Sequence, residues 1–492
     1  MRKLDYDVLV VGGGLLGCFT ARSFSRYDLR VALLERHNDL AMEVSRANTA
    51  IVYPGYDNKP GSLKTQLTLE GNRTFPALCQ ELDVPFRRCG SLMTACGPRG
   101  EGVLRRKLEQ GLANGVEGLR LLSGEEARAL EGALSPAVTA ALYAPTTGVV
   151  NPWQLCIAAA ENAWANGVEF FLNTAVTAIT PVDGGWRVRA GAQEFSARAV
   201  VNCAGLHADE VAAMAHRPKL RILPSQGDYL VLDTKAGGFL SRVIFHEPEV
   251  KGKGATLSPT ADGNLLLGPS ELEGGGKDEF ATSAQGLAFV RAAAQEVAPG
   301  VPLEHTIRSF AARRPNPFWL DYDPDTGAAS VSDRSIRNFH IEQALPGFVS
   351  LAGIKTPGLT CSRALGDYVA RMLLPYLGDP LEKPSYDPRR PGIPRFAQLS
   401  PAQQAALVAR DPAYGRLVCR CRTITEGEVL SAIRRPLGAT TLDGVKRRVG
   451  TSTGRCQGAF CTMRVLELLA RELGIPAGEV PKDGPGSWVV EP

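Results

Sequence analysis

Hydrophobic residues near the N-terminus form two short continuous runs on either side of an amphipathic stretch. The first run, YDVLVV at residues 6–11, is rich in β-branched residues and predicts a buried parallel strand. The segment LLGCFTARSFSRY (15–27) has helical spacing, and LRVALLE (29–35) predicts a second strand that ends at Glu35. Strands alternating with helices in this way are typical of an α/β fold.

A glycine-rich turn joins the first strand to the helix. Gly12, Gly14 and Gly17 fit the pattern G-x-G-x-x-G, and Glu35 lies 18 residues beyond Gly17. The glycines allow a tight turn, the helix N-terminus offers free N–H groups to a pyrophosphate, and the acidic residue accepts hydrogen bonds from a ribose. This register predicts a dinucleotide site of the Rossmann type, with Glu35 and the adjacent Arg36 as cofactor-binding residues.

Two later segments favour FAD as the dinucleotide. Residues 199–203 predict a strand that leads into Ala204 and Gly205, and residues 348–352 predict another that leads into Gly353 and a helix beginning near Thr360. A nicotinamide site needs one such crossing, whereas a flavin stretched across the sheet also needs contacts from late in the chain. The N-terminus of the last helix would stabilise negative charge on the reduced flavin ring. The alternative is that both segments are only structural strand–helix units.

The pattern between these segments is that of short strands broken by Gly, Pro and Asp turns. It predicts an antiparallel substrate domain, roughly residues 80–100 and 215–330, inserted in an FAD-binding part that spans 1–375. Residues 168–197 also look like an antiparallel accessory. Seven prolines within 375–401 predict an extended, semi-rigid linker over 376–412. A small helical cysteine-bearing domain (413–475) and a tail (476–492) follow.

Four cysteines of the C-terminal domain stand close together in the sequence: Cys419, Cys421, Cys456 and Cys461. The spacing is Cys-x-Cys, then 34 residues, then Cys-x4-Cys. Zinc modules usually open with C-x2–4-C, so the tight first pair favours a [2Fe–2S] cluster held by four thiolates. Structural zinc and free thiols remain alternatives. A flavin and a cluster on one chain would form an electron relay.

Charge and hydropathy limit the partners. The net charge is +4, and residues 413–492 hold 12 Lys/Arg and 8 Asp/Glu, so the whole surplus lies with the clustered cysteines. That surplus is too small to indicate nucleic-acid binding and suits an anionic cofactor or an acidic partner. Its basic residues Lys446, Arg447, Arg448 and Arg455 would offset the charge of a cluster or form a solvated face. No apolar run reaches the roughly 18 residues of a transmembrane segment, and residues 1–11 lack a signal-peptide cleavage site, so we expect a cytoplasmic protein.

Four stretches carry a resemblance to a known family: SRANTAIVYPGYDNKPGSLK (45–64), VVNCAGLHADE (200–210), KGKGATLSPTADGNLLLGP (251–269) and AGIKTPGLT (352–360). The chain resembles FAD-dependent oxidoreductases of the D-amino-acid-oxidase (glycine oxidase-like) superfamily. It is similar to bacterial glycerol-3-phosphate and L-2-hydroxyglutarate dehydrogenases. The C-terminal part resembles the bacterioferritin-associated-ferredoxin-like [2Fe–2S] domain.

The resemblance assigns roles to particular residues. It implies that Arg314 grips the anionic group of the substrate and that a set of cofactor residues contacts the flavin: Ser45, Asn48 and Thr49 beside it, and Gly353, Gly358, Leu359 and Thr360 with Lys355 at its far edge. For Arg314 and the neighbouring Arg313, a surface ion pair is the alternative reading.

This chain departs from the relatives at two positions. Tyr53 stands where relatives commonly have a histidine, and Lys355 replaces an acidic residue. Both should face the substrate. A phenol with a pKa near 10 is a poor base, so the substrate is expected to differ from that of the relatives, and a neutral amine substrate would not need the missing base. His246, in FHEP near the predicted pocket, is a further candidate.

These features predict an FAD-dependent dehydrogenase with Tyr53, Arg314 and Lys355 at its substrate end. The expected substrate is a small anionic alcohol, either glycerol 3-phosphate or a 2-hydroxy acid such as L-2-hydroxyglutarate. Hydride would pass to the flavin, and electrons would leave through the [2Fe–2S] cluster to a redox partner protein, a second flavoprotein or an iron–sulfur subunit. One alternative is an amino-acid or imino-acid dehydrogenase, and another is an electron-transfer subunit of a larger flavoprotein complex.

Overall fold

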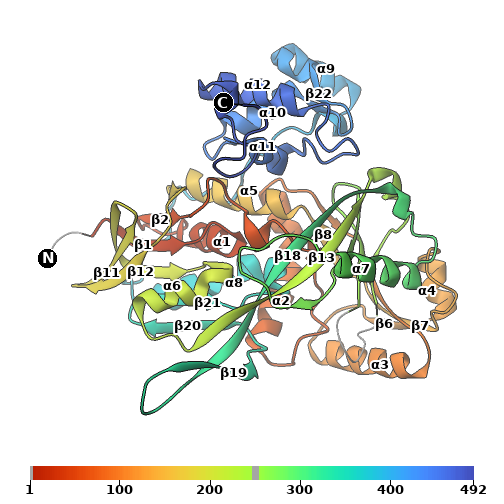
Figure 1. Cartoon of the computed structure of the whole chain (residues 1–492), viewed down its shortest axis with the longest axis horizontal. Helices are drawn as coiled ribbons and strands as arrows, with labels where there is room; N and C mark the ends of the chain where they lie inside the picture. The colour runs from red at the N-terminus through yellow and green to blue at the C-terminus, as the bar shows by residue number, and fades with distance from the viewer. Residues whose placement is uncertain (1–3, 247–253, 492) are drawn as a thin grey trace.

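A sheet whose central strands are parallel lies at the centre of the FAD-binding part in the computed structural model (Figure 1). The structure describes residues 4–246 and 254–491. Within these residues the sheet has eight strands, in the order β10-β11-β12-β1-β2-β9 with β21 and β20 beside β12. The strands are β1 (Tyr6–Val11), β2 (Val31–Leu34), β9 (Glu169–Phe171), β10 (Ala178–Val182), β11 (Gly185–Ala190), β12 (Gln193–Asn202), β20 (His340–Leu345) and β21 (Phe348–Ala352). The α/β fold class predicted from the sequence is confirmed.

Three strands of this sheet match predicted strands closely, because each is a short buried apolar run: β1, β2 and β21. One expectation is wrong. The segment that begins at residue 168 is not wholly antiparallel, because β9 pairs in parallel with β2 and extends the central sheet. Its EFF sequence is too short to distinguish the two arrangements by periodicity.

Helices α1 (Leu15–Phe24), α5 (Pro152–Ala165) and α8 (Gly358–Leu373) pack together in one hydrophobic core with α2 (Leu63–Glu81). Each buries small and apolar side chains against the central strands, which places the N-termini of α1 and α8 at the carboxyl ends of β1 and β21. The remaining helices of this part are α3 (Pro98–Ala113), α4 (Gly124–Leu130), α6 (Ala208–Ala215) and α7 (Ala284–Val297).

A second, mostly antiparallel sheet, with ten strands among the residues that the structure describes, packs over the carboxyl ends of the central strands. Its longest pair joins β13 (Leu220–Leu232) to β18 (Thr306–Tyr322), with Ser225 opposite Arg314. The other strands are β5 (Ser91–Ala95), β6 (Arg120–Ser123), β7 (Ala140–Ala144), β14 (Val243–Phe245), β15 (Thr256–Pro259), β16 (Leu265–Gly268), β17 (Leu272–Glu273) and β19 (Ala329–Ser335). It therefore takes strands from residues 91–144, beyond the predicted 80–100. A small third sheet holds β3 (Ile51–Val52), β4 (Phe86–Arg88) and β8 (Gly148–Val150).

The C-terminal domain has its own core, formed around one hairpin and three helices. These are β22 (Leu417–Cys419), β23 (Ile424–Thr425), α10 (Glu426–Arg434), α11 (Leu442–Val449) and α12 (Thr462–Leu473). The predicted tail joins this core, since Val480 is buried in it. Figure 1 shows this blue domain lying over α5 of the FAD-binding part.

The predicted linker is not extended throughout. Residues Pro401–Arg410 form helix α9, because Ser400 and Gln403 make a capping box and Pro401 occupies the first helical position. The segment before it is fastened to the FAD-binding part by an ion pair between Arg390 and Glu161, with Nε and Oε2 at 2.6 Å. The proline-rich segment therefore runs along a surface to which it is bonded.

Buried ion pairs hold the two parts together. Asp39, in the loop after β2, accepts hydrogen bonds of 2.8–3.1 Å from both Arg447 and Arg448 of α11. Arg435 forms a two-pronged pair with Glu161 of α5, with both contacts at 2.8 Å. Burial would raise the pKa of Asp39, but the two guanidinium groups hold it well below its usual range. The expectation of a solvated or cluster-facing role is wrong for Arg447 and Arg448, which are buried between the parts.

We predict that Asp39→Asn destabilises the protein by about 3–5 kcal/mol, because it leaves two buried guanidinium groups without a counter-charge. Chemical denaturation followed by far-UV circular dichroism measures this free energy of unfolding. The matched control is Asp321→Asn, whose pair with Arg334 is more than half exposed on both sides. That change should cost about 1 kcal/mol or less.

The pH dependence of the same variant gives a second check. Since folding depresses the pKa of Asp39, its stabilisation is fully present above the unfolded pKa of about 3.9 and is lost as the pH falls below it. The gap between wild type and Asp39→Asn should be constant from pH 5 to 8 and should narrow below about pH 4. If both variants lose the same small amount of unfolding free energy at pH 7, the role of Asp39 in holding the two parts together is contradicted.

Candidate functional site

A cavity of about 690 Å³ lies between the carboxyl ends of the central strands and the second sheet. It brings together most residues that the sequence predicted for the cofactor and the substrate. Those lining it are Gly12, Gly14, Glu35, Arg36, Ser45, Asn48, Thr49, Ala204, Gly205, Gly358 and Leu359, with Tyr53, Arg314 and Lys355. The other three, Gly17, Gly353 and Thr360, do not line the cavity.

The glycine turn leaves no space for side chains at its start. A Cβ on Gly12 would lie 2.7 Å from the carbonyl oxygen of Cys203, and one on Gly17 would lie 1.8 Å from that of Gly12. Gly17 thus permits the close packing of the turn itself. The Ser45 Oγ accepts a hydrogen bond of 2.9 Å from Leu15 N–H at the start of α1. The helix N-terminus faces the cavity in the arrangement that a pyrophosphate requires.

Glu35 closes the same end of the cavity. Its carboxylate is 7% exposed and accepts hydrogen bonds from the backbone N–H groups of Gly13 and His37. These use two of its roughly four acceptor positions, so it can still bind ribose hydroxyls. Burial raises the pKa of this carboxyl, while the two N–H groups lower it. Arg36 beside it pairs with Glu43 and with Asp278.

Two of the predicted late-chain residues shape the cavity from behind. A Cβ on Gly353 would lie 2.2 Å from Pro317, and its φ of +65° favours glycine. The Thr360 Oγ1 accepts a hydrogen bond of 2.9 Å from Tyr53 N–H. These residues position Tyr53, which directly follows β3, and the turn before α8. The first residues of α8, Gly358 and Leu359, line the cavity.

Arg314, Asn316 and Lys355 form a polar group at the substrate end. The Arg314 Nη1 lies 3.0 Å from the Glu271 carboxylate, and its Nη2 donates to the Ser270 carbonyl. The Lys355 Nζ donates to the Asn316 Oδ1 at 2.6 Å. Arg314 and Asn316 share a face of β18 because strand side chains alternate. This alternation would have identified Asn316 from the sequence, where it was missed.

Arg313 has a different role from its neighbour. Its side chain is buried, and its Nη1 donates at 3.0 Å to the carbonyl of Gly274 while its Nε donates to that of Glu279. The guanidinium therefore holds the loop over residues 274–279 against β18. Arg313 and Arg314 both line the cavity, but the guanidinium of Arg313 is bound to these two carbonyl groups.

Tyr53 and His246 are two titratable residues that line the cavity. Burial raises the pKa of the Tyr53 phenol, with a smaller lowering from the Thr49 hydroxyl, so the phenol stays protonated at neutral pH. Its ring stacks on Phe245, with ring centroids 5.8 Å apart. His246, the next residue, also lines the cavity, and its Nε2 lies 3.4 Å from the Glu296 carboxylate. From the sequence, His246 was a weaker candidate than Tyr53.

The four clustered cysteines form two hydrogen-bonded pairs, Cys419 with Cys461 and Cys421 with Cys456. Within the described part of the chain, no three of these sulfurs lie within 4.8 Å of one another. A tetrahedral zinc with Zn–S bonds of about 2.3 Å would bring all four to about 3.8 Å. Two separate pairs suit two irons that each take two thiolates.

Backbone N–H groups surround the sulfurs. The N–H groups of Phe460 and Gly458 point at the Cys456 sulfur and lower the pKa of its thiol, and the thiol of Cys419 lowers the pKa of Cys461 to about 6. Such N–H groups favour thiolate ligands and offset the negative charge of a cluster. Gly454 gives room for Cys421, whose Cβ would lie 2.4 Å from a Cβ on that glycine.

Comparison with known proteins identifies both parts. A family model described as FAD dependent oxidoreductase matches residues 7–372, which is most of the chain. The chain belongs to this family. A second model, described as BFD-like [2Fe-2S] binding domain, matches residues 417–471 and contains all four cysteines. FAD and a [2Fe–2S] cluster are therefore the cofactors, in agreement with the glycine turn, Glu35 and the paired thiols.

Several relatives resemble this family member closely. Glycerol 3-phosphate dehydrogenase of Caloramator mitchellensis is 40% identical over 487 residues, covering 99% of this chain and 98% of that protein. L-2-hydroxyglutarate dehydrogenase of Escherichia coli is 30% identical over 292 residues, covering 56% and 68%. The solved structure of L-alpha-glycerophosphate oxidase from Mycoplasma pneumoniae with FAD bound is 28% identical, with a TM-score of 0.70 and coverage of 78% and 98%.

The chain is thus an FAD-dependent oxidoreductase whose similar proteins include dehydrogenases and oxidases of alcohol groups. No helix in the described ranges combines the length and the apolar character needed to cross a membrane.

We predict that Cys456→Ser removes the cluster and leaves FAD bound. None of the four cysteines lines the FAD cavity, and the C-terminal domain has its own core. The iron and acid-labile sulfide contents should fall from about two of each per chain to near zero, while the content of released flavin stays at about one per chain. Cys96→Ser, at an exposed cysteine elsewhere, is the control and should change neither. Zinc in place of iron and sulfide in the wild type would contradict the cluster.

Proposed function

We propose that this protein is a glycerol-3-phosphate dehydrogenase whose electrons leave through the [2Fe–2S] cluster. The observation that carries the proposal is the pairing of Arg314 and Lys355 at one end of the FAD cavity. Similarity to the dehydrogenase of Caloramator mitchellensis over nearly the whole length of both proteins supports it.

The two cations suit a phosphate better than a single carboxylate. Arg314 presents a planar guanidinium for paired contacts with anionic oxygens, and Lys355 adds a second charge. Glu271 and Asn316 hold these two side chains, so the site is preorganised. A phosphate monoester carries up to two negative charges at neutral pH, which matches two cations.

The protein groups near the substrate divide the work of alcohol oxidation. The protonated Tyr53 phenol donates a hydrogen bond that orients the substrate hydroxyl, and His246 accepts the hydroxyl proton. FAD, when bound, supplies the hydride acceptor, and the cluster passes single electrons onward. The backbone N–H groups of α1 and the Glu35 carboxylate hold the dinucleotide. A separate redox protein would take the electrons from the cluster.

A 2-hydroxy acid such as L-2-hydroxyglutarate is the second candidate substrate, because relatives of that activity match 56% of the chain. Anaerobic reduction of the bound flavin separates the possibilities. Glycerol 3-phosphate should reduce the flavin faster than L-2-hydroxyglutarate, glycine or L-proline at equal concentration. Faster reduction by either amino acid would support an amino-acid dehydrogenase instead, and no reduction by any of the four would support a pure electron-transfer subunit.

We predict that Arg314→Leu lowers kcat/KM by on the order of 10²-fold or more. A hydrogen bond to a charged group contributes roughly 1.5–3 kcal/mol, and 1.4 kcal/mol is about tenfold. Stopped-flow reduction of the flavin at low substrate concentration measures the loss, and FAD content should be unchanged. The control is Arg221→Leu, at a half-exposed arginine of β13. A wild-type rate of flavin reduction in Arg314→Leu would contradict the substrate-binding role of Arg314.

The roles of His246 and Tyr53 are tested as a pair. His246→Gln should slow flavin reduction by about 10²–10⁴-fold, because the proton acceptor is lost. Tyr53→Phe should cost about tenfold or less, the value of one neutral hydrogen bond. The assignment fails if Tyr53→Phe slows flavin reduction more than His246→Gln does.

A further inference from the structure

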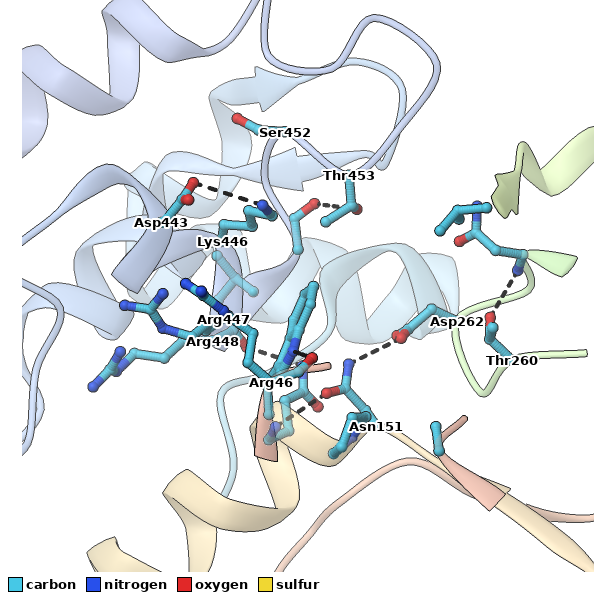
Figure 2. A pocket seen from close by; sticks show the side chains of 18 of the residues that line it. Arg46, Asn151, Thr260, Asp262, Asp443, Lys446, Arg447, Arg448, Ser452 and Thr453 are labelled. Atoms are coloured by element: carbon cyan, nitrogen blue, oxygen red, sulfur yellow. Dashed lines mark hydrogen bonds and ion pairs between the residues drawn. The ribbon is translucent and has the colours of Figure 1, made fainter. Parts of the chain in front are cut away.

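A second cavity, of about 700 Å³, lies where three parts of the chain meet (Figure 2). Its walls come from residues 46–50 and the N-terminal turn of α5, from residues 307–311 of β18, and from residues 446–457 of the C-terminal domain. It is distinct from the FAD cavity, although Ala47, Asn48 and Ala50 line both. Nothing in the proposed reaction uses this space.

Cations exceed anions on its walls, since nine Lys or Arg side chains and four Asp or Glu side chains line it. The carboxylates are shared. Asp483 pairs with both Arg46 at 2.8 Å and Arg447 at 2.9 Å, and Asp443 is shared by Lys446 and Lys482. Outside the cavity, Asp39 pairs with Arg447 and Arg448, Glu161 pairs with Arg390, and Asp83 pairs with Arg395. Among the described residues that line the cavity, the positive charge without a close carboxylate is therefore that of Lys446, Arg308 and Arg422.

Lys446 and Arg308 carry two of the positive charges that lack a close carboxylate. The Lys446 side chain is 11% exposed, and its Nζ lies 3.7 Å from the Asp443 carboxylate, which is too far for a good hydrogen bond. A dashed line joins this pair in Figure 2. Burial, together with the nearby charges of Arg308 and Lys482, lowers the pKa of Lys446 to about 8. Among the residues that the structure places, Arg308 has no carboxylate within 4 Å and donates only to Gln457, at 3.3 Å. The Lys446 ammonium also lies 5.9 Å from the centroid of the Trp153 ring, but with its carboxylate at 3.7 Å the buried charge is incompletely paired, which favours an anion beside it.

The rest of the wall suits a planar apolar group. Trp153, Ile157, Leu266 and Phe310 line the cavity, and the Trp153 Nε1 donates to the Arg46 carbonyl, which fixes the indole. The volume nearly equals that of the FAD cavity and lies within the range for nucleotide-sized ligands, about 300–1,000 Å³. Cations beside an aromatic surface match a phosphate joined to a base or ring.

We propose that this interdomain cavity binds a phosphate-bearing nucleotide, with its phosphate at Lys446 and Arg308 and its ring against Trp153. The ligand touches both redox parts. Gln457, which Arg308 contacts, directly follows the cluster residue Cys456, and Ser452 on the same wall directs its backbone N–H at two cluster sulfurs. Asn48 on the opposite wall also lines the FAD cavity. This site goes beyond the proposed dehydrogenase and does not depend on the identity of its substrate.

The test uses the full-length protein with FAD and cluster in place. Heat or acid release followed by mass spectrometry asks which nucleotides besides FAD leave the protein. Calorimetric titration of ligand-depleted holoprotein with inorganic phosphate, ADP, FMN and NADH then measures affinity, and the redox-active and redox-inactive probes distinguish the kinds of nucleotide. We expect at least one nucleotide to bind at least tenfold more tightly than inorganic phosphate.

Lys446→Gln and Arg308→Gln should each weaken that nucleotide by about tenfold or more, with FAD, iron and sulfide contents unchanged. Arg410→Gln, at an exposed residue of α9, is the matched control and should bind like the wild type. The proposal is overturned if no second nucleotide is released and no probe binds. It is also overturned if nucleotides bind no better than phosphate, or if Lys446→Gln and Arg308→Gln leave the affinity unchanged.

Discussion

Two buried carboxylates fix how the cluster domain sits on the flavoprotein. Asp39 holds Arg447 and Arg448, and Glu161 holds Arg390 and Arg435. Charges buried this deeply are favourable only when they are fully paired, so these contacts specify one docking orientation more than they add stability. A weakly placed domain would vary the separation of the two redox centres. The cluster loop, the interdomain cavity and the wall shared with the FAD cavity all depend on this placement.

Asp39 also lies within the structure that binds the dinucleotide. It follows Glu35 by four residues, and the backbone N–H of Ala41, two residues later, bonds to the carbonyl of Gly13 in the glycine turn. One short loop therefore contacts the FAD site on one side and α11 on the other. Displacement of the cluster domain would therefore shift this loop, which carries Asp39 and Ala41, before other parts of the FAD site.

The local parts of this protein could be predicted from its sequence, because each depends on neighbouring residues. The glycine turn with Glu35, the strand at 348–352 and the four cysteines were all found in this way. Contacts between distant residues could not. Nothing near Asp39 indicates Arg448, which is more than 400 residues away, and the basic run 446–448 looked like a solvated face. Helix α9 was hidden by the prolines around it, although Ser400 and Gln403 give its cap. The opposite roles of Arg313 and Arg314 followed only from the direction of each side chain on β18.

The docking contacts have a consequence for modular engineering. An unrelated ferredoxin fused after residue 400 would leave Asp39 without Arg447 and Arg448, and it would leave Glu161 with Arg390 alone. No change in the linker would restore these pairs. Transplanting this cluster domain onto another flavoprotein would need the reverse change, with both acids introduced on the recipient. A transferable module therefore consists of the cluster domain together with the two carboxylates that bind it, Asp39 and Glu161, which lie hundreds of residues away from it in the sequence.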